Sequence, residues 1–190
     1  YSGAGNSLLR IELFHADVSA EFSINTGFNG AVGKANISIP ADALERDSGD
    51  LAIRLRSLKT KRSVSSGGAL ITAMYTDIET SEDLVKRLPH AYALVRNDDN
   101  TVRPAAPVSD MSVTVTDSEG NLLRLKTGSL ISVTLPVDEE IVSSFSLAGQ
   151  QQVIYQYDPL KNEYTRSGVC NINSSNNACV GETSKLGSIV

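Results

Sequence analysis

The feature that most constrains this chain is a strict alternation of apolar and polar residues in its second half. Met111, Val113 and Val115 alternate with serine and threonine, and the same period of two recurs from Ile131 to Leu135. Successive side chains of a β-strand point to opposite faces, so this pattern predicts strands that are buried on one face and solvated on the other. An amphipathic helix would need a period near 3.6 residues instead.

Further short strands are predicted along the rest of the chain, bounded by glycine, proline, asparagine and aspartate, which favour turns. We expect them near residues 9–14, 22–24, 35–39, 51–58, 69–78, 91–96, 122–125, 145–147 and 153–157. The strand at 122–125 should pair back on the one that begins at Met111, after a turn at 117–121. Helical turns are expected at 40–44 and 80–88. The predicted fold is therefore all-β, an antiparallel β-sandwich with one or two short helices, in a single domain spanning residues 1–190.

The composition agrees with a globular β-domain and narrows the range of partners. Of 190 residues, 41% are hydrophobic and 21% charged, which is enough to build a core. Tryptophan is absent and aromatic residues make up 5%, so the core should rest on valine, isoleucine and leucine, which favour strands. The net charge of −5 disfavours nucleic acid and anionic lipid as partners. We expect contact with a membrane only through segments outside this chain.

Residues able to catalyse a reaction or hold a metal ion are sparse. His15 and His90 stand apart, and no nucleophile elbow, phosphate loop, dinucleotide fingerprint or EF-hand pattern accompanies them. We interpret the run 97–100, rich in asparagine and aspartate, as a turn rather than a calcium site, and the acidic triplet 138–140 as a solvated turn. We therefore expect no active site, no metal and no cofactor.

Two cysteines, Cys170 and Cys179, flank a short segment rich in asparagine and serine. They are either two free cytosolic thiols or one disulfide, and the loop composition favours the disulfide. Two N-glycosylation sequons, which begin at Asn36 and Asn173, add support for an exported protein. These observations predict an extracellular or cell-surface location for what we expect to be a fragment of an ectodomain.

The segment at about 150–190 resembles the GPS motif that closes the GAIN domains of adhesion receptors and polycystin-1-like proteins. The likeness rests on Tyr157 with Asp158, Tyr164, Gly168, Cys170, Cys179 and Thr183. In that family the matching positions hold an aromatic–aspartate pair, a tryptophan, a glycine–cysteine pair, the last of four cysteines and the threonine at which the chain is cut. The resemblance implies an extracellular sandwich domain whose last strand lies beside a disulfide.

This chain departs from the GPS pattern at two points. The family has two disulfides, and both members of one pair are missing here, so the resemblance implies that Cys170 and Cys179 form the other. The family also cuts its own chain before a threonine, with a histidine two residues earlier as the base. Here those positions are Gly181, Glu182 and Thr183. Glycine cannot accept a proton, and Glu182 should point away from Thr183 on a strand. The resemblance therefore implies a degenerate, non-cleaving domain that keeps residues 183–190 as its last strand.

We expect a non-catalytic extracellular adhesion or structural module of a larger surface or membrane-anchored protein. Its partners would be other domains of that protein or other extracellular proteins. One alternative is a self-cleaving GAIN-type domain, and another is a ligand- or carbohydrate-binding β-sandwich, which six tyrosines support weakly. The strand ends at Ile39-Pro40-Ala41 and Leu135-Pro136 are also similar to GAIN domains. ZU5-like domains too use a strand ending in Ile-Pro-x-x-Ala and are an alternative for the first half of the chain. An unrelated β-sandwich with a chance hairpin disulfide also stays open.

Overall fold

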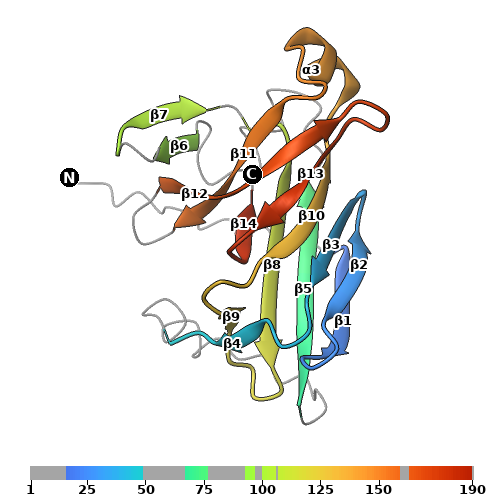
Figure 1. Cartoon of the computed structure of the whole chain (residues 1–190). Helices are drawn as coiled ribbons and strands as arrows, with labels where there is room; N and C mark the ends of the chain where they lie inside the picture. Colours follow the sequence, from blue (N-terminus) through green and yellow to red (C-terminus); the bar gives the residue numbers. More distant parts are fainter. Residues whose placement is uncertain are drawn as a thin grey trace, which may run out of the picture.

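The computed structural model describes residues 16–48, 67–76, 93–96, 100–105, 107–158 and 163–189. Strands predominate, and they confirm the predicted all-β fold (Figure 1). The strands are β1 (Val18–Ser23), β2 (Phe28–Val32), β3 (Ala35–Ile39), β4 (Leu44–Arg46), β5 (Gly68–Thr76), β6 (Ala93–Arg96), β7 (Val102–Ala105), β8 (Asp110–Asp117), β9 (Leu123–Leu125), β10 (Ile131–Pro136), β11 (Gln151–Asp158), β12 (Glu163–Asn173), β13 (Ala178–Thr183) and β14 (Gly187–Ile189). The helix of this part is α3 (Glu139–Ser144).

Several predictions fall on the remaining residues. The strands expected at 9–14 and 51–58, the helix expected at 80–88, and both histidines lie outside the described residues. The same holds for most of the acidic turn at 97–100.

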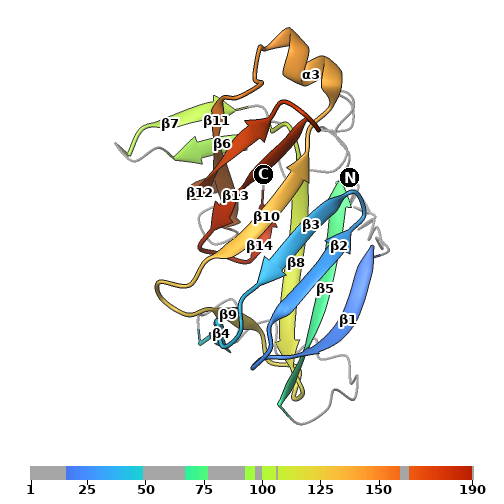
Figure 2. The ribbon, with the colours of Figure 1, turned by 45° about the vertical axis from the view of Figure 1, so that its right-hand side comes forward.

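One folded sheet carries the architecture. Its strands follow the order β1-β5-β8-β14-β11-β12-β13-β10-β3-β2, and β6 and β7 extend it from β12. Strands β1, β5 and β8 form one layer, β10, β3 and β2 form the facing layer, and the C-terminal strands join the two (Figure 2). β1 and β2 end the two layers and are consecutive in the chain. A tight turn joins them, in which the N–H groups of Thr26 and Gly27 donate to the carbonyl oxygen of Ser23.

The core lies between the two layers. It contains the inward-facing residues of β5 and β8 on one side and those of β3 and β10 on the other. Ile71, Val113, Ile37 and Val133 are each at most 1% exposed. Each such side chain contributes roughly 1.5–3 kcal/mol relative to exposure to water. The alternation seen in the sequence at Met111 and at Ile131 thus does mark half-buried strands.

Residues 145–147, where the sequence predicts a strand, form a turn that follows helix α3. The carboxylate of Asp138 caps the helix by accepting hydrogen bonds from the N–H groups of Glu140 (2.8 Å) and Ile141 (3.3 Å). The negative charges of two glutamates in the first turn interact favourably with the positive end of the helix dipole. Phe145, predicted to lie in a strand, follows the helix and is 70% exposed. The strand prediction is therefore wrong, and the acidic triplet begins a helix rather than a plain turn.

Two more local predictions are wrong. Strand β9 does not pair back on β8. Leu122, just before β9, forms one bridge with Thr116, and β9 itself pairs with β4 in a separate two-stranded sheet. The residues at 40–44 form no helical turn. Asp42 adopts a positive φ of 55°, and the chain turns there into β4. Aspartate tolerates this left-handed conformation better than most residues.

Candidate functional site

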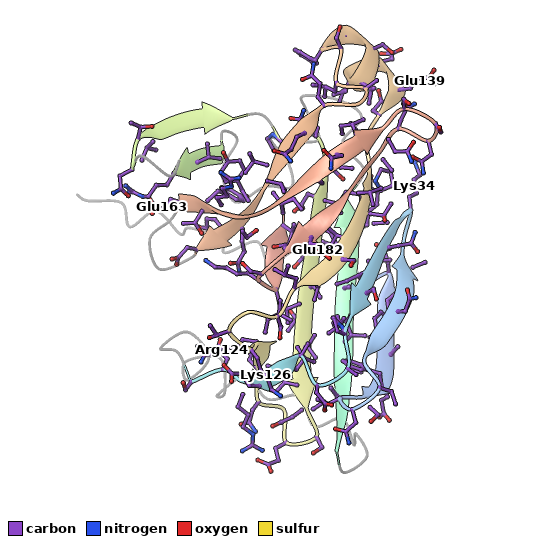
Figure 3. All side chains as sticks on the ribbon, in the orientation of Figure 1. Lys34, Arg124, Lys126, Glu139, Glu163 and Glu182 are labelled. Carbon is purple, nitrogen blue, oxygen red and sulfur yellow. A yellow bond between two sulfur atoms is a disulfide. The ribbon has the colours of Figure 1, made fainter. Side chains whose placement is uncertain are left out.

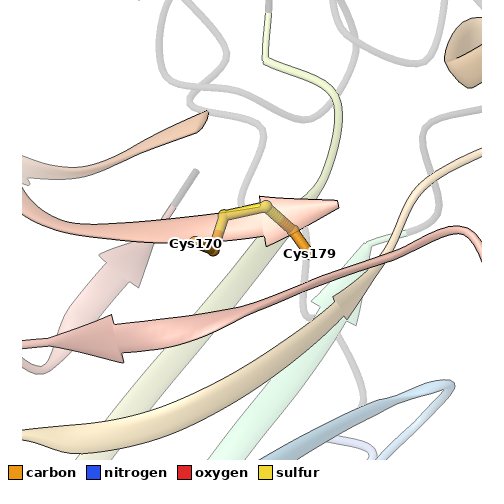
Figure 4. The surroundings of a disulfide bond; sticks show 2 residues. All are labelled: Cys170 and Cys179. Carbon is orange, nitrogen blue, oxygen red and sulfur yellow. A yellow bond between two sulfur atoms is a disulfide. The ribbon is translucent and has the colours of Figure 1, made fainter. Parts of the chain in front are cut away.

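The C-terminal residues that the sequence singles out converge on β12 and β13. Cys170 on β12 and Cys179 on β13 form a disulfide, with their Cα atoms 5.3 Å apart (Figure 4). In the strand register Cys170 lies opposite Gly181, and Cys179 lies opposite Ile172. Both cysteines are 3% exposed and belong to the main core. The predicted disulfide is confirmed, and it is a buried cross-link.

Close contact between β12 and β13 explains the glycine at position 181. A Cβ atom on Gly181 would overlap the carbonyl oxygen of Val169 and the backbone of Cys170. A Cβ atom on Gly168 would likewise overlap the carbonyl oxygen of Glu182. No side chain, histidine included, fits position 181 unless the two strands move apart. The structure thus gives a steric reason why position 181, where the GPS motif has its histidine, holds a glycine here.

The hydroxyl of Thr183 is buried and directed at a serine. Thr183 is 0% exposed, and its Oγ1 donates to the Oγ of Ser167 at 2.9 Å. The Ser167 hydroxyl donates in turn to the carbonyl oxygen of Ile154 at 3.3 Å. Glu182 is exposed on the opposite face of β13, as the sequence predicts (Figure 3). The hydrogen bonds that the structure shows for Thr183 Oγ1 therefore go to Ser167 rather than to a carboxylate.

Ser167 occupies a β-bulge in β12. The pairing of β11 with β12 shifts between Ile154 and Tyr155, which leaves Ser167 without an opposite residue. Its carbonyl oxygen accepts hydrogen bonds from the N–H (2.9 Å) and the hydroxyl (3.1 Å) of Ser184. A bulge frees backbone groups from the ladder in this way. Ser167 thus provides the point at which the end of β13 is held.

The chain crosses the β11–β12 hairpin at this bulge. β13 lies along β12, whereas β14 lies on the far side of β11. The connecting residues contact the hairpin on the way. The side-chain amide of Gln156 donates to the carbonyl oxygen of Leu186, and the Nζ of Lys185 lies 3.4 Å from the hydroxyl of Thr165. These contacts hold the crossing segment against the hairpin.

Strand β14 is inserted in the middle of the sheet. Gly187 and Ile189 lie opposite Val113 and Met111 of β8, and Ile189 also lies opposite Gln156 of β11. Ile189 is 0% exposed. The sequence predicts one last strand over 183–190. The structure divides it, because β13 ends at Thr183 and β14 begins at Gly187.

The two sequons lie apart from each other, and the asparagine of each is exposed. Asn36 lies on β3, on the outer face of its layer. Asn173 ends β12, and its Oδ1 accepts a hydrogen bond from the N–H of Ser175 at 2.8 Å. Attachment of glycans at these asparagines stays a prediction.

An ion pair that no sequence motif signals fixes the end of β12. The Nε and Nη2 atoms of Arg96 on β6 donate to the two carboxylate oxygens of Glu163, at 2.9 and 2.7 Å. β6 runs parallel to β12 here, with Val95 opposite Tyr164. Tyr164 is 0% exposed and packs on Tyr157, with ring centroids 5.2 Å apart. Because the partners are distant in sequence, only the folded chain reveals this cluster.

A second polar cluster surrounds the turn that follows β8. The carboxylate of Asp117 accepts hydrogen bonds from the N–H groups of Glu119 and Asn121, from the Asn121 amide and from Arg46 Nε at 2.8 Å. Burial raises the pKa of Asp117. The hydrogen bonds and the charge of Arg46 lower it more, so this pKa lies below its ordinary value of 3.8. The predicted turn at 117–121 is confirmed, and the carboxylate organises it.

Within the described ranges, no three His, Cys, Asp or Glu side chains gather where they could hold a metal ion. Nor does this part of the chain contain a helix long and apolar enough to traverse a lipid bilayer. Comparison with protein-family models, with curated proteins and with solved structures finds no match. Function must therefore be argued from the geometry of the C-terminal strands.

Proposed function

We propose that this chain is a non-catalytic extracellular module of a larger surface or membrane-anchored protein, GAIN-like in its C-terminal segment. The observation that carries the proposal is the buried disulfide between Cys170 and Cys179, beside the strand that ends at Thr183. Structural disulfides persist in oxidising compartments and are rare in the cytosol. A cross-link built into the core is therefore best explained by an exported protein.

Two observations support the proposal that the module does not cleave itself. Cleavage would need Oγ1 of Thr183 to attack the preceding carbonyl carbon while a base accepts its proton. The hydroxyl points instead at Ser167. The position two residues earlier, Gly181, has no room for a basic side chain. Both observations favour a structural role for Thr183.

The module would act as a mount that holds its last strands in place. β13 is held between β12 and β10, and β14 between β8 and β11. A pull on the chain beyond β14 would load these ladder hydrogen bonds first. The disulfide would then keep β12 and β13 together. Such an arrangement suits adhesion or a spacer before further segments of the parent protein.

The experiment that tests this proposal is secretion of the chain from eukaryotic cells with a tag at each end. Intact mass under denaturing, non-reducing conditions should show one uncut chain with no titratable thiol. The T183A variant is the matched control, because it removes the nucleophile and should show the same uncut chain. A fragment that begins at Thr183, released from the wild type and absent from T183A, would favour the self-cleaving alternative. Two free thiols in the folded protein would remove the case for an extracellular location.

A further inference from the structure

Part of the outer face of β2, β3, β10, β13 and β12 carries little charge, although Arg166 on β12 and Lys34 between β2 and β3 are exposed elsewhere on these strands. Two cross-strand rows of outward-pointing residues run over these five strands. One row consists of Ala31, Asn36, Thr134, Val180 and Asn171. The neighbouring row contains Ser38, and its charged member is Glu182. Neighbouring strands lie about 4.8 Å apart, so each row spans roughly 19 Å of the sheet surface.

Asn36 stands within this face in a position that is open to a bulky substituent. Its side chain is exposed, whereas the next residue, Ile37, is 1% exposed and points into the core. The third sequon residue, Ser38, points outward beside it. The residues directly opposite Asn36 on the adjacent strands are small, Ala31 and Thr134. The amide of Asn36 therefore projects into solvent with room on both sides.

The same face exposes an apolar residue. Val180 is 45% exposed and lies in the same row as Asn36, two strands away. The two rows together hold one charge, so they provide little electrostatic repulsion to keep copies of the chain apart. Surface charge keeps copies of a protein apart, and a bulky, solubilising glycan can do the same where charge is scarce. Charge is scarce here, so a cover is the remaining means.

We propose that Asn36 carries an N-linked glycan and that this glycan covers the charge-poor face. The inference rests on the proposed extracellular function, because the oligosaccharide is attached during export. In the transfer, Nδ2 of Asn36 bonds to the anomeric carbon of an oligosaccharide carried on a lipid diphosphate. The bond from that carbon to the phosphate oxygen breaks and its electron pair leaves with the lipid diphosphate. The proton lost from Nδ2 balances the departing charge.

The test uses the chain secreted from eukaryotic cells in an N173Q background, which removes the second sequon. S38A destroys the sequon and leaves Asn36 in place, whereas S38T at the same half-buried position keeps the required hydroxyl. Peptide mass spectrometry before and after glycosidase treatment reads the occupancy of Asn36. We expect an occupied Asn36 with Ser38 or with S38T, and a bare Asn36 in S38A.

The covering role is read by sedimentation velocity of the two secreted variants. We expect S38T to stay monomeric and S38A to self-associate with a dissociation constant at least about tenfold lower. Secreted, disulfide-bonded protein with a bare Asn36 in the presence of Ser38 would overturn the glycan alone. Equal self-association of S38A and S38T would overturn the covering role. A folded chain with both thiols free would instead overturn the proposed function and the glycan together.

Discussion

At the scale of single residues, the contact between β12 and β13 depends on the missing side chain of Gly181. A methyl group there would overlap Val169 and Cys170, and both belong to a strand fixed by the core. Forcing extra volume into packed structure costs about 1–3 kcal/mol. We predict that G181A lowers the free energy of unfolding by about 2–3 kcal/mol, measured by urea denaturation. E182Q, on the exposed side of the same strand, should change it by less than about 0.5 kcal/mol.

Equal stability of G181A and the wild type would show that the two strands can separate at no cost. That result would also reopen the possibility that a histidine fits at position 181. The steric argument against self-cleavage would then no longer hold.

The turn carboxylate Asp117 makes stability depend on pH. Its pKa is lower in the folded than in the unfolded chain, so its contribution is complete above the ordinary value of 3.8. The contribution is lost as the pH falls from that value through the lower folded pKa. Hydrogen bonds to a charged group contribute about 1.5–3 kcal/mol, so we predict that D117N loses about that much at neutral pH. Denaturation curves between about pH 7 and pH 2 should show the two proteins converging in acid.

The control for this prediction is Glu119 in the same turn. Its side chain is 65% exposed and forms a surface ion pair with Arg46. E119Q should cost less than about 1 kcal/mol, because an exposed ion pair contributes little to stability. Parallel pH profiles for D117N and the wild type would contradict the role given to Asp117.

Some single-residue features of the structure could be predicted from the sequence, and others could not. The run from Asp117 to Asn121 predicts a turn, and the turn is there, because short polar residues impose local backbone geometry. The partner of Asp117 was not predictable, since Arg46 lies 71 residues away in the chain. The GPS-like pattern likewise identified Gly181 and Thr183. It gave no sign of Ser167, whose role comes from a bulge that only strand pairing creates.

At the scale of elements, the period of two predicted strands well where one face is buried. β8 and β10 fall where Met111 and Ile131 begin their alternation. Helix α3 was missed because the run 138–140 was interpreted as a solvated turn, although Asp138 followed by two glutamates is a helix-capping signal. The partner of β9 was missed because three residues carry too little pattern to define which strand they pair with.

Strand β14 is short, yet its position in the middle of the sheet predicts that it is essential for the stability of the fold. Ile189 is fully buried between β8 and β11. Truncating a buried isoleucine to alanine typically costs 2–5 kcal/mol, and we predict that I189A destabilises the protein by about 2–4 kcal/mol in urea denaturation. K185A, in the exposed crossing segment, should stay within about 0.5 kcal/mol of the wild type. A neutral I189A would mean that β14 frays from the sheet and that β13 alone closes the fold.

At the scale of the whole molecule, the C-terminal strands connect the two layers. β14 lies beside β8 of one layer and β13 lies beside β10 of the other, with the β11–β12 hairpin between them. No sequence pattern gave this order, because the neighbours of a strand are set by contacts across the whole chain. The cross-link between Cys170 and Cys179 therefore sits in the part of the sheet on which both layers depend.

This placement makes the disulfide a test of the entire fold. Closing a loop of this length restricts the unfolded chain by about 2–3 kcal/mol. Both cysteines are also buried in the core, so replacing them with alanine removes packing as well. We predict that C170A/C179A lowers the free energy of unfolding by at least about 3 kcal/mol, measured by urea denaturation against the oxidised wild type. A loss confined to the 170–179 hairpin, seen as local hydrogen exchange with an unchanged global transition, would show that the two layers do not depend on these strands.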